Sequence, residues 1–150
     1  MLRSLQQALH TRILAGEFFQ ELPVLLECGS SLTQTVQQHA LSARSLCIRV
    51  CEPQPQTLNY EAPQLFVAEL LCPVQVEEPA GWGGSLHALE VAQKLATHLH
   101  LWVPPESTLG APFILAEKAF WKVLQTPVKD GAYRLQLNFL TSTFLEPYTP

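Results

Sequence analysis

Apolar residues at helical spacing predict three helices. The first covers residues 2–19, the second begins after Ser30 or Ser31 and runs to about residue 44, and the third covers residues 86–101 with Ser85 as its cap. Each helix packs one apolar stripe against the core. The stripes are Leu2, Leu5, Leu9 and Ile13 in the first, Leu32, Val36, Ala40 and Ala43 in the second, and Leu86, Leu89, Ala92, Leu95, Ala96 and Leu99 in the third.

Alternation of apolar and polar residues predicts the strands. After a short extended piece at 24–27, residues 46–51 and 66–77 alternate with a period of two, which is typical of strands with one face in the core. Pro73 cannot donate a ladder hydrogen bond, so we expect the second of these strands to be at a sheet edge, bulged or broken near that residue. Residues 52–63 contain three prolines and predict a connecting loop.

The chain is predicted to end in an antiparallel hairpin. Residues 113–124 fit a helix or a strand by their spacing, and a strand is favoured because the final strand, around 133–139, needs a neighbour across the turn at Lys129–Gly131. The elements together predict one α+β domain over residues 1–150. A small, mostly antiparallel β-sheet packs there against two or three α-helices.

Composition restricts the class of protein and its partners. Apolar residues make up 47% of the chain and charged residues 15%, which excludes a disordered chain and suggests that partners cover part of the surface. A net charge of −4 without a basic block argues against nucleic acid as the main ligand. The chain lacks the apolar run that a membrane span needs, so we expect a protein of the cytosol that is neither secreted nor transmembrane.

The N-terminus admits a second interpretation. Residues 1–16 contain two arginines and no acidic residue, which is compatible with a mitochondrial presequence. The stripe at helical spacing favours the first helix of the fold instead.

Cysteine and histidine spacing predicts neither a disulfide framework nor a metal site. Buried, reduced thiols are the simplest interpretation of Cys28, Cys47, Cys51 and Cys72. Cys47 and Cys51 would lie about 13 Å apart on one strand, too far to bridge. His87 and His98 would lie about 16 Å apart on one helix, too far to share a metal. His98 and His100 suit the helix C-terminus as partners of its dipole.

Catalytic motifs are absent from the sequence. It has no nucleophile elbow at Ser85, no phosphate-binding loop and no dinucleotide fingerprint, so we expect no enzyme, no catalytic residue, no metal and no cofactor. Glu77 and Glu78 should point to opposite faces and are interpreted as a solvated strand end rather than an acid–base pair. The turn residues Trp82, Gly83 and Gly84 are the candidate partner contact, because aromatic residues are enriched at interfaces; the alternative is that Trp82 folds back onto the core.

The order of these elements is similar to that of the tail terminator and tail completion proteins of long-tailed bacteriophages and prophages. The resemblance covers most of the chain and rests on this architecture and on segments 22–27, 74–79 and 92–102. It implies a structural, homo-oligomeric ring, expected to be a hexamer, that ends growth of the tail tube and joins the tail to head–tail connector proteins. It also implies a bacterial cytoplasmic location during virion assembly and a place in the virion tail afterwards.

Another class of function stays open from the sequence. A small cytosolic enzyme or ligand-binding domain would have a pocket with convergent polar groups between helix 86–101 and the sheet. In the assembly interpretation, loops 52–63 and 103–112 and the strand that contains Pro73 are the expected surfaces between subunits.

Overall fold

The computed structural model describes residues 2–27, 45–62, 65–105, 111–118, 120–125 and 132–145. The predicted second helix, Cys28 and the turn at Lys129–Gly131 lie outside these ranges. The described part of the chain forms a mixed sheet of seven strands with two α-helices, an α+β architecture as predicted. In chain order the elements are α1 (Leu2–Leu14), the 3-10 helix η1 (Glu17–Phe19), β1 (Val24–Leu26), β2 (Cys47–Val50), β3 (Gln54–Ala62), β4 (Leu65–Pro79), α3 (Ala88–Leu99), β5 (Ile114–Leu115), β6 (Trp121–Gln125) and β7 (Ala132–Leu145).

The long antiparallel pair β4–β7 forms the middle of the sheet. It runs in register from Phe66 opposite Leu145 to Pro79 opposite Ala132. On the far side of β4, β3 and β2 follow one another, and on the far side of β7 lie β5 and β6. All of these pairs are antiparallel, and the pair β1–β2 is the parallel one among the described strands.

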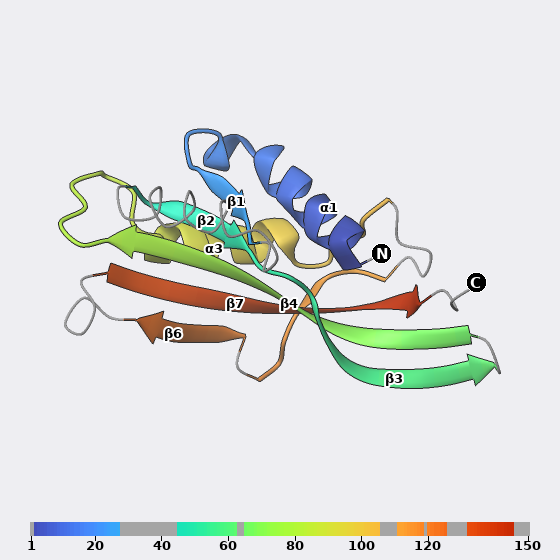
Figure 1. Ribbon diagram of the computed structural model, residues 1–150. Helices are drawn as coiled ribbons and strands as arrows, with labels where there is room; N and C mark the ends of the chain where they lie inside the picture. The colour runs from blue at the N-terminus through green and yellow to red at the C-terminus, as the bar shows by residue number, and fades with distance from the viewer. Residues whose placement is uncertain are drawn as a thin grey trace.

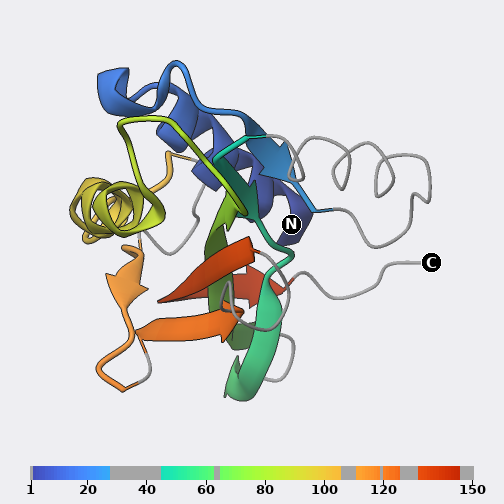
Figure 2. The same cartoon turned by 90° about the vertical axis from the view of Figure 1, so that its left-hand side faces the viewer.

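Both α-helices cover one face of this sheet (Figure 1, Figure 2). Alternate residues of β4 point at them and are buried, namely Ala68, Leu70, Cys72, Val74 and Val76. Leu9 and Ile13 of α1 and Leu95 and Leu99 of α3 pack into the same core with no exposed surface. No helix in the described ranges is long and apolar enough to cross a membrane.

Pro73 lies inside a central strand, so the prediction of an edge or broken strand is wrong. Pro73 pairs with Asn138 of β7, and its carbonyl oxygen accepts a hydrogen bond of 3.0 Å from the Cys51 N–H on the opposite side. A strand residue directs its N–H and C=O to the same side. The missing N–H of Pro73 therefore faces the point where the partner of β4 changes from β3 to β2. The interruption lies between β2 and β3, and β4 itself stays continuous.

The predicted loop at 52–63 is also wrong, because most of it is strand β3. This strand pairs with β4 from Gln54 opposite Leu71 to Ala62 opposite Leu65. It lies at a sheet edge, and its register shifts between Pro55 and Thr57, two conditions under which a strand tolerates proline.

Helix boundaries differ from those predicted. The first helix ends at Leu14, and η1 follows it. The third begins at Ala88 rather than Leu86, so Ser85 is not its cap, and Leu86 does not set its buried face. Its buried residues are Ala88, Val91, Ala92, Leu95 and Leu99, while Leu89 is 52% exposed.

The strand interpretation of residues 113–124 is confirmed in two pieces, β5 and β6, both paired with β7. The final strand is confirmed and is longer than predicted, as is the extended piece at 24–27 in the form of β1. One feature of β2 differs: all four of its residues are buried, so the strand does not have a solvent face.

Candidate functional site: the outer face and the edges of the sheet

The face of the sheet turned away from the helices carries a row of polar residues. Alternation along β4 and β7 puts Gln75 and Glu77 of β4 on this outer face, directly opposite Gln136 and Arg134 of β7. The register, rather than the order along the sequence, brings these side chains together.

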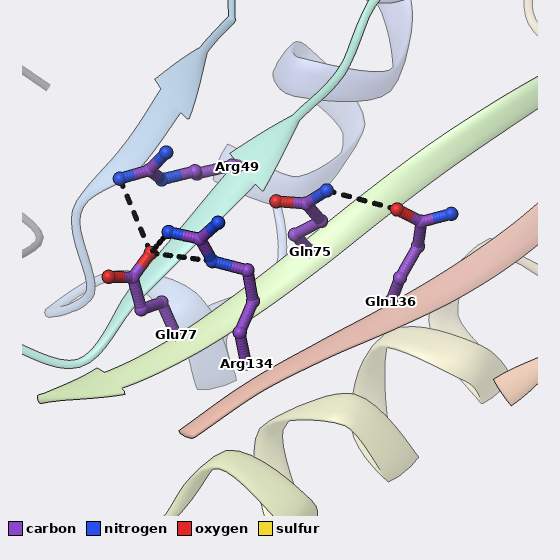
Figure 3. A network of polar contacts seen from close by, with 5 residues as sticks. All are labelled: Arg49, Gln75, Glu77, Arg134 and Gln136. Atoms are coloured by element: carbon purple, nitrogen blue, oxygen red, sulfur yellow. Dashed lines mark hydrogen bonds and ion pairs between the residues drawn. The ribbon is translucent and has the colours of Figure 1, made fainter. Parts of the chain in front are cut away.

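Glu77 is the centre of a buried ion cluster (Figure 3). Arg134 donates to Glu77 Oε2 from Nη2 at 2.8 Å and from Nε at 3.1 Å, and Arg49 Nη2 lies 3.3 Å from the same oxygen. The side chains of Arg49 and Glu77 are 5% and 8% exposed. The interpretation of Glu77 as a solvated strand end is therefore wrong, because β2 and β7 each bring a guanidinium group to it; a buried carboxylate needs such partners.

Amide groups continue the row along the same face. Gln75 Nε2 donates to Gln136 Oε1 at 2.9 Å, and Gln136 Nε2 donates to Asn138 Oδ1 at 2.8 Å. The amides of β4 and β7 are thus engaged with one another, an arrangement that fixes strand register.

Glu78 points to the other face, as predicted for the neighbour of Glu77. Its Oε1 accepts a hydrogen bond of 3.1 Å from the Ala88 N–H and lies 2.9 Å from His87 Nδ1. A carboxylate at this position satisfies an N–H at the start of α3 and interacts favourably with the helix dipole. Glu78 thus takes the capping role that the sequence assigned to Ser85, while its side chain stays 22% exposed at the end of β4.

The described cysteines are buried, as predicted. Burial, with a contribution from the Glu77 carboxylate, raises the pKa of Cys47 to about 11. Burial also raises the pKa of Cys72 to about 12 and that of Cys51 further still. These thiols stay protonated at neutral pH, and a protonated thiol is a poor nucleophile and a poor metal ligand.

The histidines of the α3 region contact separate protein groups. His98 Nε2 lies 2.8 Å from the Arg12 carbonyl oxygen, and His100 Nδ1 accepts a hydrogen bond of 3.2 Å from the Leu115 N–H. Among the described residues, no three histidine, cysteine, aspartate or glutamate side chains come together as metal ligands.

Trp82 folds back onto its own turn. Its Nε1–H donates to the Leu86 carbonyl oxygen at 2.9 Å, and its partly buried ring packs against the core. A Cβ added at Gly84 would lie 2.6 Å from this ring, so the ring needs a glycine there. The side chain of Trp82 thus follows the second interpretation of the sequence, in which it folds back onto the core. Partner contact by the turn, with Gly83 and Gly84, stays a prediction.

The interface between α3 and the sheet is filled. Val91, Leu95 and Leu99 of α3 belong to the same hydrophobic core as Leu137 and Phe139 of β7, and all five are fully buried. Several hollows are lined by described residues outside this interface. One groove of about 440 Å³ runs between α1 and Trp102, another of about 440 Å³ lies between η1 and the Trp82 turn, and one of about 260 Å³ lies on the outer face beside Ile114 and Leu140.

Among the described strands, β1, β3, β5 and β6 each pair with a single strand, and β3 and β6 are the longer edge strands with exposed side chains. Within the described ranges, β3 pairs only with β4, and every side chain from Gln54 to Tyr60 is exposed, including Leu58 at 45% and Tyr60 at 70%. β6 pairs only with β7 there, and Val123 and Leu124 are 44% and 39% exposed. Both edges therefore carry apolar side chains beside backbone groups that have no strand partner among the described residues.

Sequence reasoning missed the edge at β3 because prolines dominated the interpretation of residues 52–63. The signal that could have found it is the alternation of Leu58 and Tyr60 with Thr57 and Asn59. No protein-family model and no curated protein matches this chain.

Proposed function

We propose that this chain is a structural subunit similar to a bacteriophage tail terminator. Copies of it form a ring, expected to be a hexamer, that ends growth of the tail tube and joins the tail to the head–tail connector. The observation that carries this proposal is the presence of two exposed, apolar sheet edges, β3 and β6, on opposite sides of the β4–β7 pair.

A ring of identical subunits needs two different surfaces that fit each other, because each copy meets its two neighbours through opposite sides. β3 and β6 satisfy this requirement, since β4 and β7 separate them. They also lie near opposite ends of that pair (Figure 1). Long exposed edges of this kind are usually covered in the assembled state.

The chemistry of the interior supports assembly over catalysis. The described thiols are protonated at neutral pH, the carboxylate of Glu77 is engaged by two guanidinium groups, and the space between α3 and the sheet is filled by apolar side chains. An enzyme or ligand-binding domain with its pocket under α3 would instead present convergent polar groups there.

Native mass is the measurement that tests this function. Size-exclusion chromatography with light scattering over a hundredfold range of concentration, followed by negative-stain imaging, should give a ring-sized species that grows with concentration. The double variant Leu58→Ser, Tyr60→Ser should reduce that species, because it removes apolar surface from one edge. Leu89→Ser is the matched control, since Leu89 is exposed but lies on α3. A monomer over the whole range, with no ring in images, contradicts the proposal.

A further inference from the structure

We propose that neighbouring copies join by antiparallel pairing of β6 of one copy with β3 of the next, so that the sheet continues from subunit to subunit. The inference rests on the proposed function and adds the identity and direction of the contact. The occupant of each edge is a second copy of this chain.

The backbone of β6 presents hydrogen-bonding groups to its free edge. The Asn138 N–H of β7 donates to the Phe120 carbonyl oxygen at 3.0 Å. Residues of an antiparallel pair alternate between bonded and non-bonded positions, so Trp121 and Val123, which oppose Leu137 and Leu135, direct their N–H and C=O groups away from β7. An added strand would satisfy these groups.

The strand directions fit antiparallel pairing. β6 is antiparallel to β7, β7 to β4 and β4 to β3, so β6 and β3 run in opposite directions within one subunit. A rotation about an axis roughly along the strands preserves those directions. It therefore brings β6 of one copy beside β3 of the next in antiparallel orientation.

The two edges match in apolar character on the helix-covered face. Val123 opposes the buried Leu135, and Leu58 opposes the buried Ala68, so both exposed side chains lie on the helix side of the sheet. Tyr60, which packs edge-on against Phe66 at 5.1 Å between ring centroids, lies on the same side. Pairing of the edges would bury these exposed apolar groups against one another.

The two edges also match in charge on the outer face. Lys122 opposes Gln136, whose side chain belongs to the outer polar row, and Lys122 is exposed. Beside β3, the exposed Glu69 lies on the same face and accepts a hydrogen bond of 2.8 Å from Thr57 Oγ1. Joined edges bring the Lys122 ammonium group of one copy towards the Glu69 carboxylate of the next.

The position of the edges sets the geometry of the ring. Leu58 of β3 lies opposite Ala68 of β4, which in turn lies opposite Thr143 of β7. Val123 of β6 lies opposite Leu135, eight residues earlier on β7. At about 3.3 Å per residue, this is an offset of about 26 Å along the strands. The strands must then be tilted relative to the ring axis, as they are in closed barrels, for the edges to meet.

Charge reversal tests the contact. Lys122→Glu alone and Glu69→Lys alone each put like charges at every junction, so each should raise the concentration of half-assembly about fivefold per contact or more. In an equimolar mixture of the two variants, alternating copies bring opposite charges together again. The concentration of half-assembly of the mixture should therefore lie within about twofold of that of the native chain. Lys118→Glu makes the same charge change at an exposed position outside β6 and should leave assembly unchanged.

Disulfide trapping gives a second readout. In a Cys28→Ser background, a chain with Val123→Cys is mixed with a tagged chain that carries Leu58→Cys or Tyr60→Cys. Directly opposed cross-strand positions lie within disulfide reach, so mild oxidation should link the two chains covalently. Leu89→Cys in place of Val123→Cys should give no such product.

The outcomes separate the inference from the proposed function. Rings that form without the cross-link and without sensitivity to Lys122→Glu overturn the pairing of β6 with β3 and leave the ring intact as a proposal. A chain that gives only monomers, and no cross-link at the highest concentration, overturns both.

Discussion

β2 and β3 pair with the same side of β4, one after the other, yet they have opposite surroundings. Every residue of β2 is buried, whereas every side chain of β3 from Gln54 to Tyr60 is exposed. β2 is flanked by β1 and lies under α1, while β3 has β4 as its only described neighbour. Position in the sheet, rather than strand propensity, thus separates a strand that holds the fold together from one that is available to a partner.

The largest expected difference between the two strands is in core packing. Ile48→Ala in β2 should lower the free energy of unfolding by about 3 kcal/mol, because Ile48 is fully buried and the change leaves a cavity. Leu58→Ala in β3 should change it by less than about 0.5 kcal/mol. Urea denaturation of both variants measures this, and equal losses would contradict the contrast.

The next difference concerns charge. Glu77→Gln should lower the free energy of unfolding by about 2 kcal/mol, because Arg49 of β2 and Arg134 lose the anion that compensates them. Glu69→Gln, beside β3, removes an exposed carboxylate and should cost less than about 0.5 kcal/mol. The comparison fails if denaturation curves of the two variants coincide.

Alkaline pH should affect the β2 region through Cys47. Its pKa in the folded chain is about 11, raised from 9.0. Below pH 9 both the folded and the unfolded thiol are protonated, and the stabilising contribution is complete. From pH 9 to about 11 the unfolded thiol ionises while the folded one keeps its proton, so stability falls, by roughly 1 kcal/mol at pH 10.

The variant Cys47→Ala isolates this contribution. Its free energy of unfolding should fall less steeply between pH 8 and pH 10 than that of the native chain, in urea titrations at each pH. If the free energies of unfolding of the variant and the native chain fell with equal slope over this pH range, Cys47 would not titrate as described.

The smallest expected effect is within β3 itself. Tyr60→Ala should lower the free energy of unfolding by only about 0.5 kcal/mol, because it removes an edge-to-face contact with Phe66 at an exposed site. Tyr60→Phe keeps the ring and should match the native chain in thermal denaturation. A loss of several kcal/mol would mean that β3 contributes to the fold as β2 does.

Much of the fold could be predicted because local patterns express it. The periodicity of residues 2–14 and 88–99 identified both described helices, and alternation identified β2, β4 and β7. Prolines misled the prediction twice: Pro55 hid β3, and Pro73 suggested that β4 was an edge. In both cases the error lay in which neighbour a strand has, a property that local pattern does not carry.

The candidate site was less accessible from sequence. Glu77 and Arg134 are 57 positions apart, and Arg49 precedes Glu77 by 28, so no motif links them. Only the registers of β2, β4 and β7 bring the three side chains to one oxygen atom. The turn at Trp82 was identified from its composition, but the direction in which the ring folds was not.

The sequence by itself determined the α+β class, the presence of both described helices, the apolar stripe of α1, the alternation of the long strands and the burial of Cys47, Cys51 and Cys72, because periodicity and hydrophobicity are local properties. Tertiary structure decided which carboxylate is buried, which residue caps α3 and which strands are left at the edges. Those features depend on strand order and register, which are set by the packing of segments far apart in the chain.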